Sequence, residues 1–331
     1  MNKTMYKFVF ISLFFSILYV TVTVADAEAR SALIFAVAND GVVLNDNDFT
    51  HGLSLGYYRD IEEVSWVAAP LEAIGMDKNS RQYKLGFQLT QMMWSPLDIS
   101  KEYPEPDERP YAGIIALETE LALMGHENAD KFTLYLGVIG PSSYMEETQT
   151  FMHEIIKSPT PNGWDNQVEQ QALINVNYEK QHLLYRRTTQ TSTGIELSNS
   201  MRLMAGNYRS EVATGLIARW GQDLENSFAS SSINRQAPVN AGLITGENPG
   251  YNLFAGIDGL YRFNDITLDG EVPSEVYPVT VEPWQLTAAL GIVYYRANWG
   301  ASITFAAKSS EYREDKNDIY TNGVLSIFYL W

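Results

Sequence analysis

Apolar residues recur at every second position along most of this chain, with small or polar residues between them. Residues 82–90 alternate in this way, and residues 298–305 repeat the pattern near the C-terminus. A period of two indicates a β-strand with one apolar face. A tilted strand that crosses the bilayer core needs about 9 to 11 residues, and residues 82–90 reach that length. The pattern therefore predicts an all-β protein whose strands can span a membrane.

Twelve segments carry this alternation. They cover residues 33–39, 50–58, 82–91, 112–123, 132–139, 171–185, 194–205, 211–220, 251–263, 285–296, 299–308 and 320–331. An even number is required if an antiparallel barrel is to close with both termini on one side of the membrane. The chain also ends on an aromatic residue, Trp331, as outer-membrane barrels commonly do. We predict a twelve-stranded antiparallel transmembrane β-barrel, and a soluble β-sandwich is the alternative because it shares the period of two.

The first residues predict export. Lys3 and Lys7 precede an apolar run over 8–20, and Ala25-Asp26-Ala27 supplies the small-x-small pattern that signal peptidase accepts. The run is shorter than the roughly 20 residues of a spanning helix, which disfavours the alternative of an uncleaved membrane anchor. We expect residues 1–27 to be a signal peptide and residues 28–331 to form one barrel domain in the outer membrane of a Gram-negative bacterium.

Composition narrows the classes of function. A hydrophobic content of 45% indicates a packed or lipid-facing fold rather than a disordered chain. The chain has no cysteine, which excludes disulfides and thiolate metal sites. Its net charge of −17 disfavours nucleic acid and anionic lipid headgroups as partners, unless cations lie between them. A twelve-stranded barrel can close as a monomer, which is the oligomeric state that we expect.

The even number of strands also assigns the connections to the two sides of the membrane. If the first strand rises from the periplasm, the first, third and fifth connections lie at the extracellular rim, and these contain the unusual residues. Two long connections, 60–81 and 221–250, then fall on the periplasmic side, where turns are usually short. Either they contain small helices or a strand boundary is misplaced.

A helix is predicted in the fifth connection. Ser143 and Glu146 have the spacing of a capping box, and Pro159 follows, so the helix should span about 144–157. Gln149 and His153 are four residues apart and share one face of it. An ordinary amphipathic loop helix with an unrelated histidine is the alternative.

The first connection is rich in carboxylates and amides, including Asn39, Asp40 and residues 45–48, and it is followed by Thr50 and His51. Oxygen donors at this density suit a hard cation such as Ca²⁺. Their spacing does not fit the EF-hand loop, so a solvated loop is equally compatible with the sequence.

Four blocks of residues together resemble one family, the LpxR-type lipid A 3'-O-deacylases. The blocks are 38–40 with 48–52, then 108–113, then 137–141, and finally Gln149 and His153 followed by 163–167. Their order and spacing are those of the family, and they span most of the mature chain. The resemblance implies an active site at the extracellular rim, between the barrel wall and the loop helix. It also implies Ca²⁺-dependent hydrolysis of the ester of the 3'-linked acyloxyacyl group of lipid A.

The resemblance further implies the roles of individual residues. The family's catalytic positions fall on His153, Asn39 and, by a weaker match, Lys101, and the positions around its metal fall on Asp40, Thr50 and Gln149. Ester hydrolysis needs a base for water and a positive centre for the oxyanion, which His153 and Ca²⁺ would supply. We also expect Lys101 and Arg109 to contact a lipid phosphate or the oxyanion. His51 departs from the family, which more usually has a small residue or asparagine there, and so leaves open a second titrating group.

Two other functions remain compatible with the sequence. An outer-membrane phospholipase would use a serine, histidine and amide triad, for which we find no matched signature. A non-catalytic channel or adhesin would keep the strands and not need His153. The remaining histidines, His126 in a predicted periplasmic turn and His182 within a strand, are expected to have no part in catalysis.

Overall fold

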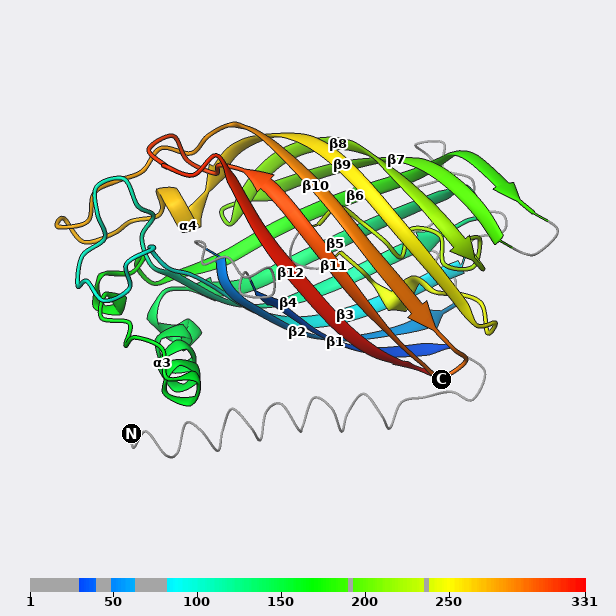
Figure 1. Cartoon of the computed structure of the whole chain (residues 1–331), viewed down its shortest axis with the longest axis horizontal. Coiled ribbons are helices and arrows are strands. Elements are labelled where there is room, and N and C mark those ends of the chain that lie inside the picture. The colour runs from blue at the N-terminus through cyan, green and yellow to red at the C-terminus, as the bar shows by residue number, and fades with distance from the viewer. Residues whose placement is uncertain (1–29, 40–48, 63–81, 190–192, 235–237) are drawn as a thin grey trace.

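A computed structural model describes residues 30–39, 49–62, 82–189, 193–234 and 238–331 (Figure 1). It confirms the predicted twelve-stranded barrel. The strands are β1 Ser31–Asn39, β2 Phe49–Ile61, β3 Gln82–Trp94, β4 Ala112–Met124, β5 Asn128–Ile139, β6 Gln171–Thr188, β7 Thr193–Gly206, β8 Arg209–Gln222, β9 Gly250–Asp265, β10 Trp284–Tyr295, β11 Trp299–Ser309 and β12 Ile319–Leu330. Each strand pairs antiparallel with its neighbours in sequence, and β1 pairs with β12 to close the barrel.

The two ends of the barrel differ in what they contain. The backbone N–H of Ser31 donates to the carbonyl of Trp331 at 2.7 Å, so the chain enters and leaves the barrel at one end, here called the terminus end. The opposite end is called the helix end because α3 (Met145–Ile156) and α4 (Ile266–Asp269) lie there (Figure 1). The strands that flank the first, third and fifth connections meet these connections at the helix end, so the three share one side of the barrel, as the even number of strands predicts.

Alternation along each strand separates an apolar outside from a polar inside. In β10, Leu286, Leu290 and Ile292 are exposed. Gln285 and Thr287, on either side of Leu286, point to the opposite face and are buried. An outward apolar band of this kind is what lipid requires, because charged or polar side chains on that face are costly. None of the helices in the described ranges has the length and apolar character needed to cross a membrane.

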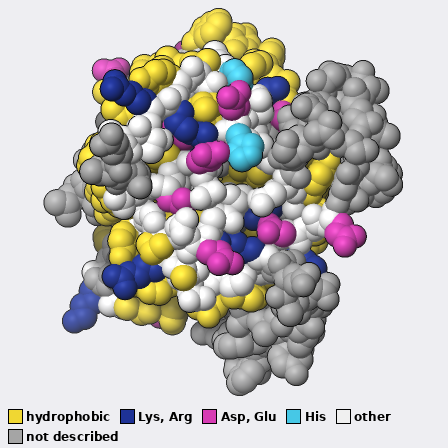
Figure 2. Space-filling view, turned by 90° about the vertical axis from the view of Figure 1, so that its right-hand side faces the viewer, with side chains coloured by type: hydrophobic (Ala, Val, Ile, Leu, Met, Phe, Trp, Pro, Cys, Tyr) yellow, Lys and Arg dark blue, Asp and Glu magenta, His cyan; other side chains and the backbone are white. Residues whose placement is uncertain are grey.

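The long connection between β8 and β9 fills the lumen. Its described parts, 223–234 and 238–249, include the 3₁₀ helix η4 (Ala241–Leu243), and the side chains of Ile233 and Ile244 pack against inward-facing Tyr58 and Phe254. We call residues 223–249 the plug. The predicted strand boundaries here were therefore correct to within two residues, and the long segment is explained by a plug that enters from the terminus end. Figure 2 shows this end with apolar side chains mostly at the periphery and polar or charged ones across the middle. The other long connection lies mainly in 63–81, outside the described residues.

The predicted capping box is wrong. The chain first forms a 3₁₀ turn, η2 (Pro141–Ser143), so Ser143 lies within that turn and cannot begin α3. Tyr144 is the N-cap of α3, in the left-handed region with φ 59°, and makes no side-chain capping hydrogen bond. The helix ends at Ile156 because Lys157 also adopts a left-handed conformation, with φ 58°, and reverses the chain.

Candidate functional site

The first turn of α3 lies on the outside of the barrel wall. Met92 and Trp94 of β3 point inward into the lumen core, so Met93 between them points outward. Met93 is nevertheless only 1% exposed, because Met145 of α3 and Trp164 of η3 (Trp164–Asn166) cover it. The fifth connection therefore packs against the face of the wall that elsewhere meets lipid.

A glycine in the neighbouring strand allows this close approach. Gly113 of β4 occupies an outward position under the same helix, and a Cβ there would come within 2.6 Å of the Met145 side chain. Any larger residue at this position would push α3 off the wall.

Three residues of α3, each four positions apart, form its covered side. Met145 packs on the wall, Gln149 is 2% exposed, and His153 is half-buried. The shared face predicted for Gln149 and His153 is thus present, and it is the face turned toward the rest of the protein.

The Trp164 indole fixes the orientation of the Gln149 amide. Trp164 Nε1 donates to Gln149 Oε1 at 2.6 Å in a buried hydrogen bond. An indole N–H can only donate, so the carbonyl oxygen must face it and the amide NH₂ must point the other way. Gln149 Nε2 is buried and has no hydrogen-bond partner among the described residues. The side chain therefore presents unused donors to an acceptor that enters the site.

The imidazole of His153 is held by the chain that follows the helix. Its Nδ1 lies 2.6 Å from the carbonyl oxygen of Pro159. A carbonyl only accepts, so Nδ1 carries a proton, and the neutral imidazole then has its lone pair on Nε2. This tautomer is the one that a general base needs. The sequence analysis used Pro159 only to predict the end of the helix and included Trp164 only in a block that resembles the family, so it gave neither residue a part in the site.

The third connection is tied to the fifth by hydrogen bonds to its backbone carbonyls. Asn162 N–H donates to Ile99 O at 2.9 Å, and Asn166 Nδ2 donates to Glu102 O at 3.0 Å. Tyr111 and Trp164 pack ring against ring, with centroids 4.9 Å apart. These contacts hold η3, and through it the Gln149 amide, against the barrel.

Lys101 lies in this third connection, but its ammonium group is engaged within its own loop. The side chain is 45% exposed and ion-pairs with Glu105 and, at 3.8 Å, with Asp98. The hydrogen bond with Glu105 raises the pKa of Lys101 above its ordinary value. Lys101 would reach a lipid phosphate only by leaving these carboxylates.

The strand ends on either side of the first connection bring further polar residues to the same part of the wall. Asn39 ends β1 at an outward position, and His51 at the start of β2 pairs across the strands with outward-facing Met93. The register is irregular between Phe49 and His51, which places Thr50 in a bulge. The Thr50 side chain and the whole of Asp40 lie outside the described residues. Polar residues are costly on a lipid-facing wall. The outward positions of Asn39 and His51 therefore indicate that this end of β1 and β2 belongs to the candidate site.

Within the ranges that the structure describes, no group of three histidine, aspartate or glutamate side chains is placed to hold a metal ion. Asp40, the predicted carboxylate ligand, is not part of those ranges.

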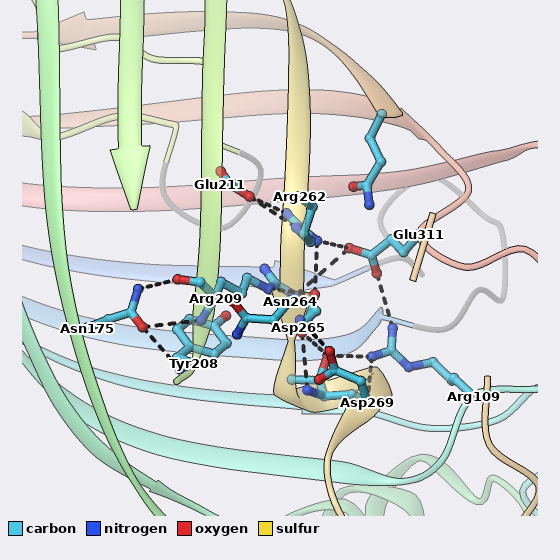
Figure 3. Close-up of polar contacts among 12 residues, drawn as sticks. Arg109, Asn175, Tyr208, Arg209, Glu211, Arg262, Asn264, Asp265, Asp269 and Glu311 are labelled. Atoms are coloured by element: carbon cyan, nitrogen blue, oxygen red, sulfur yellow. Dashed lines mark hydrogen bonds and ion pairs between the residues drawn. The ribbon is translucent and has the colours of Figure 1, made fainter. Parts of the chain in front are cut away.

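Arg109 is not available to a lipid. It was expected at the exposed rim, but it is fully buried at the helix end of the lumen, with Nη1 3.2 Å from Glu311 and Nη2 2.9 Å from Thr267 Oγ1. Glu311 also pairs with Arg262, and Asp265 pairs with Arg209 and Arg262 (Figure 3). Lys308 is a further partner of Glu311. Arg109 therefore belongs to a buried ion-pair network that crosses the lumen.

A polar cavity of about 170 Å³ lies in the lumen between this network and the plug. Many of the polar side chains that line it form ion pairs or hydrogen bonds with one another. Lys131 pairs with Glu179 at 2.6 Å, and Thr90 donates to Glu118 at 2.7 Å. The cavity can hold water, whereas α3 and its covered side are on the other face of the wall.

Comparison with known proteins agrees with this architecture. A family model described as outer membrane protein LpxR matches residues 9–331. The structure is similar to LpxR from Salmonella typhimurium, with a TM-score of 0.77 and 18% identity over 90% of this chain and 99% of that one. The β domain of the Bordetella autotransporter BrkA gives a TM-score of only 0.42 at 10% identity, over 91% of this chain and 98% of that one. No curated protein sequence matches the chain. Since the family model matches nearly the whole chain, the protein belongs to the LpxR family of outer membrane proteins.

Proposed function

We propose that this protein is a lipid A deacylase that hydrolyses the ester of the 3'-linked acyloxyacyl group in the outer leaflet. Membership of the LpxR family supports the activity. The observation that carries the proposal is the position of Gln149 and His153 on the covered side of a helix that starts on the lipid-facing wall. A lipid can reach such a site without leaving the membrane.

His153 and Gln149 supply complementary parts of the reaction. His153 Nε2 accepts a proton from water, and the water oxygen attacks the ester carbonyl carbon. The amide protons of Gln149 donate to the oxyanion that develops on the carbonyl oxygen. As the ester C–O bond breaks, the imidazolium returns its proton to the departing sugar oxygen, giving a free acid and an alcohol. Asn39, on the outer face of β1, would orient the water.

We also propose that the activity depends on Ca²⁺, which would polarise the ester carbonyl when bound. Of the predicted ligands Asp40, Thr50 and Gln149, only Gln149 has a described side chain. Because Gln149 Oε1 accepts the hydrogen bond from Trp164, the amide presents its N–H groups to the site. In this orientation the side chain does not fit a calcium ligand. The metal proposal therefore rests on Asp40 and Thr50, and no step above uses the metal.

A channel is disfavoured by the contents of the lumen. The plug enters from the terminus end, and the Arg109–Glu311 network crosses the lumen near the helix end. A phospholipase would also hydrolyse an acyl ester, so the experiment must distinguish the two lipid substrates.

The test is mass spectrometry of lipid A and phospholipid incubated with detergent-solubilised protein, with Ca²⁺ or with EDTA. Wild type with Ca²⁺ should remove the 3' acyloxyacyl mass from lipid A, and His153→Ala should not. His126→Ala is the matched control, since His126 is an exposed histidine at the terminus end that pairs with Glu225. Unchanged lipid A with folded wild type and Ca²⁺ would contradict the proposal, and loss of a phospholipid acyl chain alone would favour the phospholipase.

A further inference from the structure

Three large apolar side chains of α3 are exposed on one flank of the helix. Phe151 is 55% exposed, Met152 41% and Ile155 59%. At about 100° per residue they fall within one arc of roughly 100°. At one edge of this arc, Met152 is next to Met145 of the covered side. At the other edge, Phe151 is next to Glu147 and Glu154. The helix therefore has three faces: covered, apolar and acidic.

The apolar flank borders a surface that already meets lipid. The first turn of α3 lies over outward-facing Gly113 of β4. Two and four residues further along the same face of this strand are Ile115, which is partly exposed, and Leu117, which is 44% exposed. The outward apolar band of the barrel thus begins next to the helix.

The orientation of α3 suits a position in the membrane surface. Figure 1 shows the helix to one side of the strand ends, outside the ring of strands, with its axis roughly across the long axis of the barrel. The long axis of a transmembrane barrel lies near the bilayer normal, so α3 runs approximately in the plane of the membrane. An amphipathic helix in that plane buries its apolar face among the upper parts of the acyl chains.

We propose that α3 is an interfacial helix whose Phe151, Met152 and Ile155 side chains insert between the acyl chains of the bilayer that the barrel spans. Glu147 and Glu154 remain in water. This arrangement sets Gln149 and His153 at the boundary of headgroups and acyl chains, the depth at which the ester carbonyls of lipids lie. The inference concerns membrane contact and does not require the protein to hydrolyse lipid A.

The absence of cysteine from the sequence allows a direct test. Single-cysteine variants Phe151→Cys and Ile155→Cys are labelled with an environment-sensitive fluorophore, and the barrel is reconstituted into phosphatidylethanolamine and phosphatidylglycerol vesicles with and without lipid A. Glu147→Cys and Glu154→Cys are the controls on the same helix, and Leu117→Cys is the control on the barrel wall. Folding of each variant is checked by the heat-dependent shift of barrel mobility on gels.

The proposal expects lipids with a doxyl group on the acyl chain to quench labels at 151 and 155 about as strongly as at 117. Aqueous iodide should instead quench labels at 147 and 154. Equal doxyl quenching at all four helix positions would overturn the proposal. Blue-shifted emission at 151 and 155 without doxyl quenching would also overturn it, because a protein surface rather than lipid would then cover the flank.

Discussion

Replacing Gln149 with methionine separates its proposed donation to the oxyanion from its structural role. Methionine has a similar length and keeps the packing against Trp164, but it has neither the carbonyl oxygen nor the amide protons. Loss of a single oxyanion donor typically lowers kcat on the order of 100-fold. We expect a decrease of that size for Gln149→Met, with little change in KM.

The same substitution has a predictable effect on stability. It leaves Trp164 Nε1–H buried without its acceptor at 2.6 Å, and an unsatisfied buried donor costs about 1–3 kcal/mol. Adding Trp164→Phe removes the donor as well, so no N–H is left unsatisfied, although the smaller ring lowers stability by leaving a cavity. The double variant should therefore be at least as stable as Trp164→Phe alone, but it should remain as inactive as Gln149→Met.

Stability is measured as the urea midpoint of the gel mobility shift, and kcat from the release of fatty acid from lipid A in mixed micelles. Wild-type kcat in a folded Gln149→Met protein would refute the donor role. Recovery of kcat in the double variant would show that the single substitution acted only through stability.

Three further predictions concern the lumen and the third connection. Glu311→Gln should destabilise the barrel by about 3–5 kcal/mol, because it leaves the surrounding buried cations undercompensated, whereas the exposed control Glu275→Gln should leave the urea midpoint within the scatter of wild type. Replacing the plug, 223–249, with a short Gly-Ser turn should not by itself open a conducting pore in planar bilayers, because the Arg109–Glu311 network still crosses the lumen near the helix end, and a conducting variant that is correctly folded would show that the network does not close the lumen. Burial raises the pKa of Glu108, so the folded protein disfavours the carboxylate form, and its stability falls as pH rises from the unfolded pKa through the higher folded pKa of this group. Glu108→Gln should therefore be more stable than wild type at pH 7 but not near pH 4, and a pH-independent difference would contradict this.

The sequence predicted all twelve strands because each face of a barrel strand meets one kind of surroundings along its whole length. The boundaries were less accurate where polar residues continue a strand. The fifth strand was predicted from residue 132 but begins at Asn128, because buried Asp130 is satisfied by the hydroxyl of Tyr178 on the neighbouring strand at 2.7 Å. That partner cannot be recognised from local pattern.

Only part of the candidate site was predicted, because its other features also depend on partners that the local pattern does not show. The helical spacing of Gln149 and His153 is local, and the structure retains it. The orientation of the Gln149 amide depends on Trp164, and the burial of Arg109 depends on Glu311, which is 202 residues away in the chain. The second contact exists only after the barrel has closed, and the first only after the residues that follow α3 have folded back against it.

The place of α3 on the outside of the wall has a kinetic consequence. An enzyme that meets its substrate on this face samples the lipids that diffuse sideways past it, in two dimensions. Its rate then follows the mole fraction of substrate in the surface and not the amount per volume of suspension, so adding inert lipid should slow the enzyme even when total substrate is unchanged.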